Sequence, residues 1–295
     1  MPGKVLFVYN VMSGSGTIRA KTDTVNEAFN RADKLVTFFR ISQSNDMELR
    51  EIFAEGSYDT LVVAGGDGTI NSVVNDMFHA GANLPLGIIP SGTSNDFASS
   101  LGITGPFSRC LDNIIYHEPR YVDIAMLNNE RYFVGTCAGG IFVNVSYKTS
   151  NDFKRALGPT AYYIKALTEV GTFKPFKLEI KAGDGRNFEE EALLFFITNG
   201  SHAGGFTQLI NKADINDGLM DIVIIKECLN VELVALFFKA VTNNLLDDKN
   251  VLHIKAEKCV VSSNKRIVLS VDGEKGDALP VNFEVVPDKL KIFFP

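Results

Sequence analysis

The sequence predicts an α/β domain of Rossmann-like type followed by a mostly antiparallel β-sandwich domain. Three observations lead to this prediction. Strand-like and helix-like runs alternate up to about residue 122, short alternating strands separated by turn residues follow, and 295 residues exceed what one hydrophobic core usually organises. We place the first domain at residues 1–122, joined by the C-terminal segment 285–295, and the second at residues 123–284.

Composition excludes several classes of protein. Hydrophobic residues make up 45% of the chain and charged residues 22%, which is an ordinary globular balance. A net charge of −6 argues against a nucleic-acid binder, because duplex affinity depends on Lys and Arg at phosphates. The four cysteines form no CxxC pair, so we expect free thiols in a reducing compartment. With no signal peptide and no membrane-length apolar run, the expected location is the cytoplasm.

The first domain is expected to hold a parallel sheet covered on both faces, because its strands are short apolar runs separated by helices. The predicted strands are residues 5–9, 35–40, 60–64 and 86–89. The predicted helices are residues 21–34 and 47–54, one starting at Thr69 and one starting at Phe97.

The second domain begins with a hairpin whose turn is expected at Asn128 and Asn129. Alternating strands follow in the runs "KLEIKAGDGRNFEEEALLFFITNG", "LMDIVIIKE", "NVLHIKAEKCVVSS", "RIVLSVDGE" and "VNFEVVP". Helices are predicted at residues 162–167 and 231–246. One face of the second helix carries apolar side chains that favour core packing over membrane insertion: Leu233, Leu236, Phe237, Ala240 and Val241.

A glycine turn joins the third strand to its helix. It reads Gly65, Gly66, Asp67, Gly68 and Thr69. Such a turn lets backbone N–H groups approach a phosphate, at the positive end of the new helix. A carboxylate beside a phosphate requires magnesium or ordered water between them, so Asp67 indicates a phosphate-plus-metal turn. An ordinary tight turn is the alternative.

Two further turns rich in small residues follow apolar strands, at residues 10–16 and 90–98. Three such turns at one edge of one sheet would form a polar, phosphate-sized crevice, which favours a nucleotide site. Within the third turn, Asp96 either caps the helix that starts at Phe97 or belongs to an active-site water network.

"GGDGTINSVVND", "IPSGTSNDFASSLG", "INDGLMDI" and "VDGE" resemble the diacylglycerol kinase catalytic family, especially its soluble bacterial lipid kinases, and the resemblance spans nearly the whole chain. GGDGT alone is shared with NAD kinases, whereas its pairing with SGTSNDFA is specific. The resemblance implies an ATP-binding α/β domain, a β-rich lipid-substrate domain and an active site in the cleft between them.

The resemblance also implies roles for particular residues, with ATP and magnesium as cofactors. Glu274 would be the general base on the lipid hydroxyl, and Asp67 would act near the ATP phosphates. Magnesium would be held by Asp217 with the backbone carbonyls of Asp214 and Leu219. The implied ATP contacts are Asn10, Ser42, Gly66, Asp67, Gly68, Thr69, Ile70, Asn71, Ser72 and Thr93, and we also place Gly65 and Asp96 in the nucleotide site. Simple turn residues remain the alternative for Asp217 and Glu274.

Three positions depart from the family pattern. Val11 and Asn211 each replace a usual proline, and Ser72 replaces a usual glutamate. The change at Ser72 removes a carboxylate from the rim of the nucleotide site, which bears on nucleotide or metal preference.

The expected function is an ATP-dependent lipid kinase that transfers the γ-phosphate to a hydroxyl of diacylglycerol or a related lipid. The alternatives are an NAD kinase-like phosphotransferase and a non-catalytic nucleotide- or lipid-binding regulator. The expected partner is a lipid at the membrane surface, with peripheral contact at its inner face, and no nucleic acid. The basic residues Lys148, Lys154, Arg155 and Lys165 form either a solvated face or a contact for anionic lipid. The resemblance makes a homodimer an expectation as well.

Overall fold

The computed structural model describes residues 2–10, 18–41, 46–141, 174–210 and 213–295. They divide into two compact units, Met1–Val122 with Asp288–Pro295, and Asp123–Pro287. Several sequence predictions lie outside the described residues: the turn at residues 11–16, Ser42, the helix at 162–167 and the four basic residues of 148–165.

The first unit is built on a parallel sheet. Its strands β1 (Gly3–Asn10), β2 (Lys34–Ile41), β3 (Thr60–Gly65) and β4 (Leu86–Pro90) lie in the order β4-β3-β1-β2, and every pairing among them is parallel. The end of β15 (Val281–Ile292) joins this sheet beside β4, where Ile292 pairs with Leu86. Every residue of β3 is buried, which explains why its sequence is a continuous apolar run.

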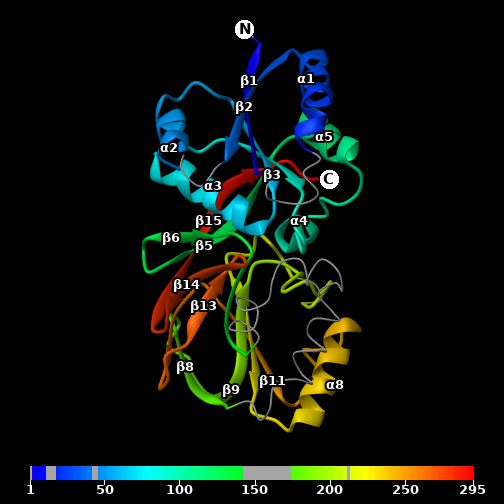
Figure 1. The fold of residues 1–295 in the computed structure, drawn as a ribbon. Coiled ribbons are helices and arrows are strands. Elements are labelled where there is room, and N and C mark those ends of the chain that lie inside the picture. The colour runs from blue at the N-terminus through cyan, green and yellow to red at the C-terminus, as the bar shows by residue number, and fades with distance from the viewer. Residues whose placement is uncertain (1, 11–17, 42–45, 142–173, 211–212) are drawn as a thin grey trace. The chain divides into compact units, whose positions relative to one another are not determined.

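Helices cover both faces of this sheet (Figure 1). The helices α2 (Asp46–Ala54) and α3 (Asp67–His79) pack together on one side, and α1 (Thr22–Arg31) and α5 (Phe107–Tyr116) on the other. The helix α3 begins at Asp67, two residues before the predicted start, because Gly66 takes the extended backbone of an N-cap. The short helix α4 (Asp96–Ser100) follows β4, and α5 is a helix that the sequence analysis did not predict.

The second unit is an antiparallel assembly. Its strands are β5 (Arg120–Leu127, which crosses from the first unit), β6 (Arg131–Phe133), β7 (Thr136–Gly140), β8 (Phe176–Ala182), β9 (Asn187–Thr198), β10 (Met220–Lys226), β11 (Val251–Ala256), β12 (Lys258–Ser263), β13 (Val268–Val271), β14 (Glu274–Ala278) and most of β15. The run of residues 251–263 forms two strands, not one. The predicted β5–β6 hairpin is confirmed, and both of its turn residues, Asn128 and Asn129, have positive φ values of 51° and 60°.

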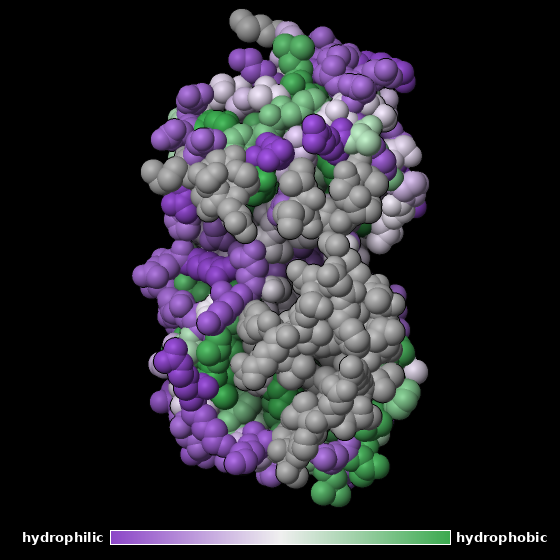
Figure 2. Space-filling model, in the orientation of Figure 1, coloured by the Kyte–Doolittle hydropathy of each residue, from purple (hydrophilic) through white to green (hydrophobic). Residues whose placement is uncertain are grey.

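The helix α8 (Asn230–Val241) covers one face of this assembly and ends before the predicted residue 246. Its residues Leu233, Leu236, Phe237 and Ala240 are buried, as predicted for a core-facing helix. Val241 does not belong to that face, because it is 46% exposed. The outward face of α8 is also apolar, and it contributes to the green surface at the lower right of Figure 2.

None of the helices within the described residues combines the length and the apolar character needed to span a bilayer.

Candidate functional site

In the first unit, the turns after β3 and β4 are in backbone contact. A Cβ atom added to Gly92 would lie 2.5 Å from the Cα atom of Gly66, so neither glycine can carry a side chain without a shift of backbone. The N–H of Ser91 also donates to the carbonyl of Gly65 at 2.9 Å. Two segments that lie far apart in the sequence therefore form one surface at the carboxyl edge of the sheet.

Asp67 ties these two turns together. Its Oδ1 accepts a hydrogen bond from the N–H of Phe97 at 3.1 Å, and its Oδ2 accepts one from the N–H of Asp96 at 3.2 Å. Asp67 therefore caps the N-terminus of α4, while it is itself the first residue of α3. Burial raises the pKa of its carboxyl above the ordinary value, although these backbone N–H donors act in the opposite direction.

Further residues of the predicted ATP set lie at the same edge. Nδ2 of Asn10, at the end of β1, donates to Oγ1 of Thr69 at 3.3 Å, which brings two of the predicted contacts together. Ser72 and Thr93 are exposed, whereas Ile70 and Asn71 are buried in α3, so Ile70 could reach a ligand only through its backbone.

Ser91, in the turn after β4, is a residue for which the sequence alone predicts no role. Its Oγ is buried and has no hydrogen-bond partner within the described part of the chain. A buried hydroxyl without a partner is unfavourable unless water or a ligand satisfies it. Ser91 is therefore a candidate contact for a bound phosphate.

In the second unit, Glu274 is the first residue of β14, directly after the turn at Asp272 and Gly273. Its side chain is 53% exposed, and Oε2 lies 3.6 Å from Nη2 of Arg131 on β6. Partial burial raises the pKa of Glu274, and the guanidinium of Arg131 opposes that shift. Glu274 is thus a carboxylate that is accessible to a substrate and can accept a proton.

The position of Glu274 depends on Asp272, a residue of the "VDGE" motif for which the sequence alone predicts no role. Asp272 is 3% exposed. Its carboxylate accepts hydrogen bonds from the backbone N–H groups of Val134, Gly135 and Thr136, at 2.9, 2.8 and 2.7 Å respectively. A buried carboxylate with three backbone donors is strongly held, so the turn before Glu274 is anchored to the segment between β6 and β7.

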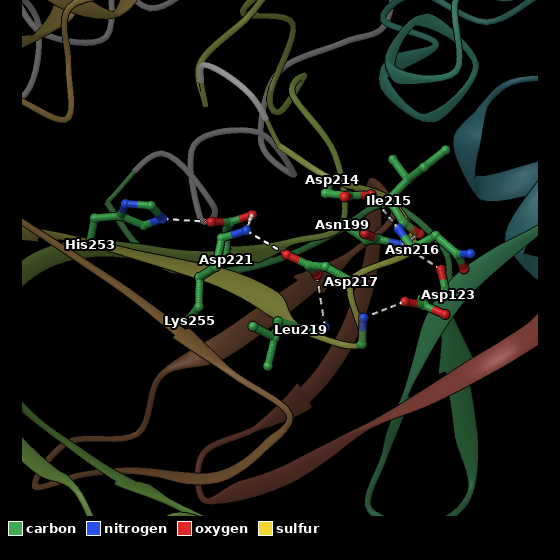
Figure 3. Close-up of polar contacts among 11 residues, drawn as sticks. Asp123, Asn199, Asp214, Ile215, Asn216, Asp217, Leu219, Asp221, His253 and Lys255 are labelled. Carbon is green, nitrogen blue, oxygen red and sulfur yellow. Dashed lines mark hydrogen bonds and ion pairs between the residues drawn. The ribbon is translucent and has the colours of Figure 1, made fainter.

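The predicted metal ligand Asp217 lies in a network of charged groups (Figure 3). Its Oδ1 accepts from the N–H of Leu219 at 3.0 Å, and its Oδ2 accepts from Nζ of Lys255 at 2.7 Å. Asp214, another member of the predicted set, accepts from the N–H of Asn216 at 3.1 Å. The structure therefore brings Asp214, Asp217 and Leu219 together in one turn, at residues 214–219.

Two buried residues hold this turn in place. Oδ2 of Asp123 accepts from the N–H of Gly218 at 2.8 Å. The side chain of Asn199 donates through Nδ2 to the carbonyls of Asp123 and Ile215. Its Oδ1 is buried and has no partner within the described residues, so it is an acceptor that a cation or a water could satisfy.

The donor set of this turn fits a hard cation, because magnesium prefers carboxylate and carbonyl oxygens. The described residues contain no group of three or more His, Cys, Asp or Glu side chains that could hold a metal. Magnesium held here would therefore depend on one carboxylate, that of Asp217, with the backbone carbonyls of Asp214 and Leu219.

Comparison with known proteins agrees with the resemblance of the motifs. Residues 4–127 match the family model of the diacylglycerol kinase catalytic domain, and residues 136–294 match that of the YegS C-terminal NAD kinase beta sandwich-like domain. The diacylglycerol kinase of Staphylococcus aureus strain JH9 is 33% identical over 296 aligned residues, which cover 100% of this chain and 93% of that protein.

Solved structures of similar proteins show the same fold. A crystal structure of a candidate diacylglycerol kinase from Bacillus anthracis strain Sterne has a TM-score of 0.84 at 25% identity, covering 99% of this chain and 95% of that one. A second structure of such a protein from that strain has a TM-score of 0.82 at 24% identity, covering 99% and 97%. The predicted fold class, an α/β domain followed by a β-sandwich, is confirmed. The chain therefore belongs to the diacylglycerol kinase catalytic family, and it is an ATP-dependent lipid kinase.

Proposed function

We propose that the chain transfers the γ-phosphate of ATP to a hydroxyl of diacylglycerol or a related lipid, with Glu274 as the general base. The observation that carries this assignment is the setting of Glu274. Its carboxylate is more than half exposed, yet the turn before it is fixed by the three hydrogen bonds of Asp272. A general base needs this combination of access to a substrate and a defined position.

The nucleotide is assigned to the first unit, at the joined turns of residues 65–72 and 90–96 with Asn10. Gly66 and Gly92 carry no side chains where the two turns meet, which suits the close approach of phosphate oxygens to the backbone. Asp67 gives this surface its shape by capping α4. Ser42 stays in the proposed ATP set through the family resemblance alone.

Magnesium is assigned to the turn at residues 214–219, with Asp217 supplying the carboxylate and Asp214 and Leu219 their carbonyls. In kinases, a bound magnesium ion neutralises phosphate charge or stabilises the fold around the site. Asp123 and Asn199 would hold the turn ready for it, because both bond to its backbone.

During transfer, Glu274 would accept the proton of the lipid hydroxyl as that oxygen forms its bond to the γ-phosphorus and the bond to the β-phosphate oxygen breaks. Glu274 must be ionised for this step. Arg131 favours the ionised form against the effect of partial burial. We further propose a cytoplasmic protein that contacts the inner membrane face peripherally, where its lipid resides, and that forms a homodimer.

The assignment is tested by transfer of labelled γ-phosphate from ATP to a panel of lipid hydroxyls in mixed micelles, with NAD as a competing acceptor. We expect labelled lipid and no labelled NAD. Glu274→Gln should fold normally and lose ~10²–10⁴-fold in turnover, because an amide of the same size cannot accept the proton. Labelled NAD without labelled lipid would contradict the substrate class, and a Glu274→Gln variant with near-normal kcat would remove Glu274 from the mechanism.

A further inference from the structure

Lys255 of β11 lies within reach of two carboxylates. Its Nζ donates to Oδ2 of Asp217 at 2.7 Å and lies 3.9 Å from Oδ2 of Asp221 (Figure 3). The side chain of Lys255 is 33% exposed, that of Asp217 is 24% exposed and that of Asp221 is 3% exposed. The ammonium therefore already occupies one oxygen of the carboxylate to which we assign magnesium.

The register of the strands explains why Asp221 is the second partner. In the antiparallel pair of β10 and β11, Asp221 lies opposite Lys255, and Val223 lies opposite His253. Alternate residues of β11 share a face, so His253 and Lys255 flank Asp221, and Nε2 of His253 lies 2.6 Å from its Oδ1. Because Asp221 is buried, its charge needs compensation from these neighbours.

A magnesium ion and an ammonium group on the same carboxylate repel each other, and both draw on the single negative charge of Asp217. Magnesium also requires short bonds of about 2.1 Å in a strict octahedral arrangement, which leaves little room for a neighbouring cation. Magnesium binding to Asp217 is therefore favoured when Lys255 moves away from that carboxylate. Oδ2 of Asp221 is close enough to pair with the displaced ammonium, so the ammonium of Lys255 keeps a negatively charged partner.

We propose that Lys255 is a built-in competitor of magnesium at Asp217. Lys255 pairs with Asp217 when no metal is bound, pairs with Asp221 when Asp217 takes the metal, and so sets the magnesium affinity of the turn. This inference rests on the proposed function, in which Asp217 is the carboxylate ligand of magnesium.

The chain offers a matched control in Lys226 on β10. Its Nζ lies 3.2 Å from Oε1 of Glu190, and the two side chains are 32% and 29% exposed, close to the values for Lys255 and Asp217. Lys226→Met removes a comparable ion pair from the same unit without touching the turn at residues 214–219. It therefore reports the general effect of losing one lysine.

The experiment follows thermal unfolding of the full chain as magnesium chloride is added, without ATP or lipid. Metal that binds only the folded state raises Tm by mass action. In Lys255→Met, a given rise in Tm should occur at an about fivefold lower magnesium concentration than in the wild type, because a partly exposed competing ion pair is lost. Lys255→Gln, which keeps a polar side chain without charge, should give the same shift. Lys226→Met should leave the magnesium dependence unchanged.

The outcomes separate this inference from the assignment of the metal site. If Asp217→Asn abolishes the magnesium effect but both Lys255 variants titrate like the wild type, the metal site stands and the competition is wrong. If Asp217→Asn and the wild type respond equally to magnesium, Asp217 is not a ligand, and both the assignment and the inference are overturned. The labelled-phosphate assay reports lipid kinase activity independently of either result.

Discussion

Replacement of Asp272 by asparagine tests whether one buried carboxylate positions the proposed general base. Oδ1 of Asp272 accepts from the N–H groups of Gly135 and Thr136, and Oδ2 accepts from that of Val134. An asparagine can keep the first two bonds through its oxygen. Its NH₂ group would then face the N–H of Val134, so two donors would be left opposed in a buried place.

The cost can be estimated from these bonds. A buried donor left without an acceptor costs about 1–3 kcal/mol, and the two remaining bonds lose the contribution of the charge, about 0.5–1 kcal/mol each. We therefore expect Asp272→Asn to lower the free energy of unfolding by about 3 kcal/mol. Because Glu274 follows two residues later, the displaced turn should also lower kcat by about 10–100-fold.

Chemical denaturation measures the loss of stability, and amide hydrogen exchange at residues 134–136 reports the lost bonds directly. Asp277→Asn is the matched control, because Asp277 is an exposed residue of β14, the strand that begins at Glu274, and we expect a change within about 0.5 kcal/mol. If Asp272→Asn unfolds at the same denaturant concentration as Asp277→Asn, with residues 134–136 still protected, Asp272 does not anchor the turn.

Two further predictions concern the other carboxylates. Arg131→Met should move the acid limb of the kcat/KM profile to higher pH. Glu274 must be ionised to act, and burial already raises its pKa. The variant removes the guanidinium that opposes this rise, so the pKa of Glu274 should increase further. An acid limb unchanged from the wild type, and from the control Lys275→Met, would show that Arg131 does not act on the base. Asp67→Asn should lower the free energy of unfolding by about 1–2 kcal/mol and weaken ATP binding. The carboxylate of Asp67 accepts from two N–H groups at the start of α4, and an amide keeps only one oxygen for them. Thermal unfolding and ATP titration measure both effects, and normal stability with normal ATP affinity would contradict the role of Asp67.

The local structure of this protein and its family could be predicted from the sequence. The apolar run of β3 ends at a glycine-rich turn and the helical spacing that follows it is regular, so a strand, a turn and a helix were predictable from neighbouring residues alone. The hairpin at Asn128 and Asn129 followed from residues that tolerate positive φ. The quoted motifs were also sufficient for the family, because several short patterns occur in one order along the chain.

Only the tertiary structure decided which groups each carboxylate contacts. Asp67 meets residues 96 and 97, Asp272 meets residues 134–136, and Asp217 meets Lys255, all across long separations in sequence. A local motif specifies the residue types of a turn, but its distant partners depend on strand order and register. For Lys255 this is decisive, because the register of β10 and β11 places its ammonium between two carboxylates, and nothing in the run "HIKAEK" predicts that contact.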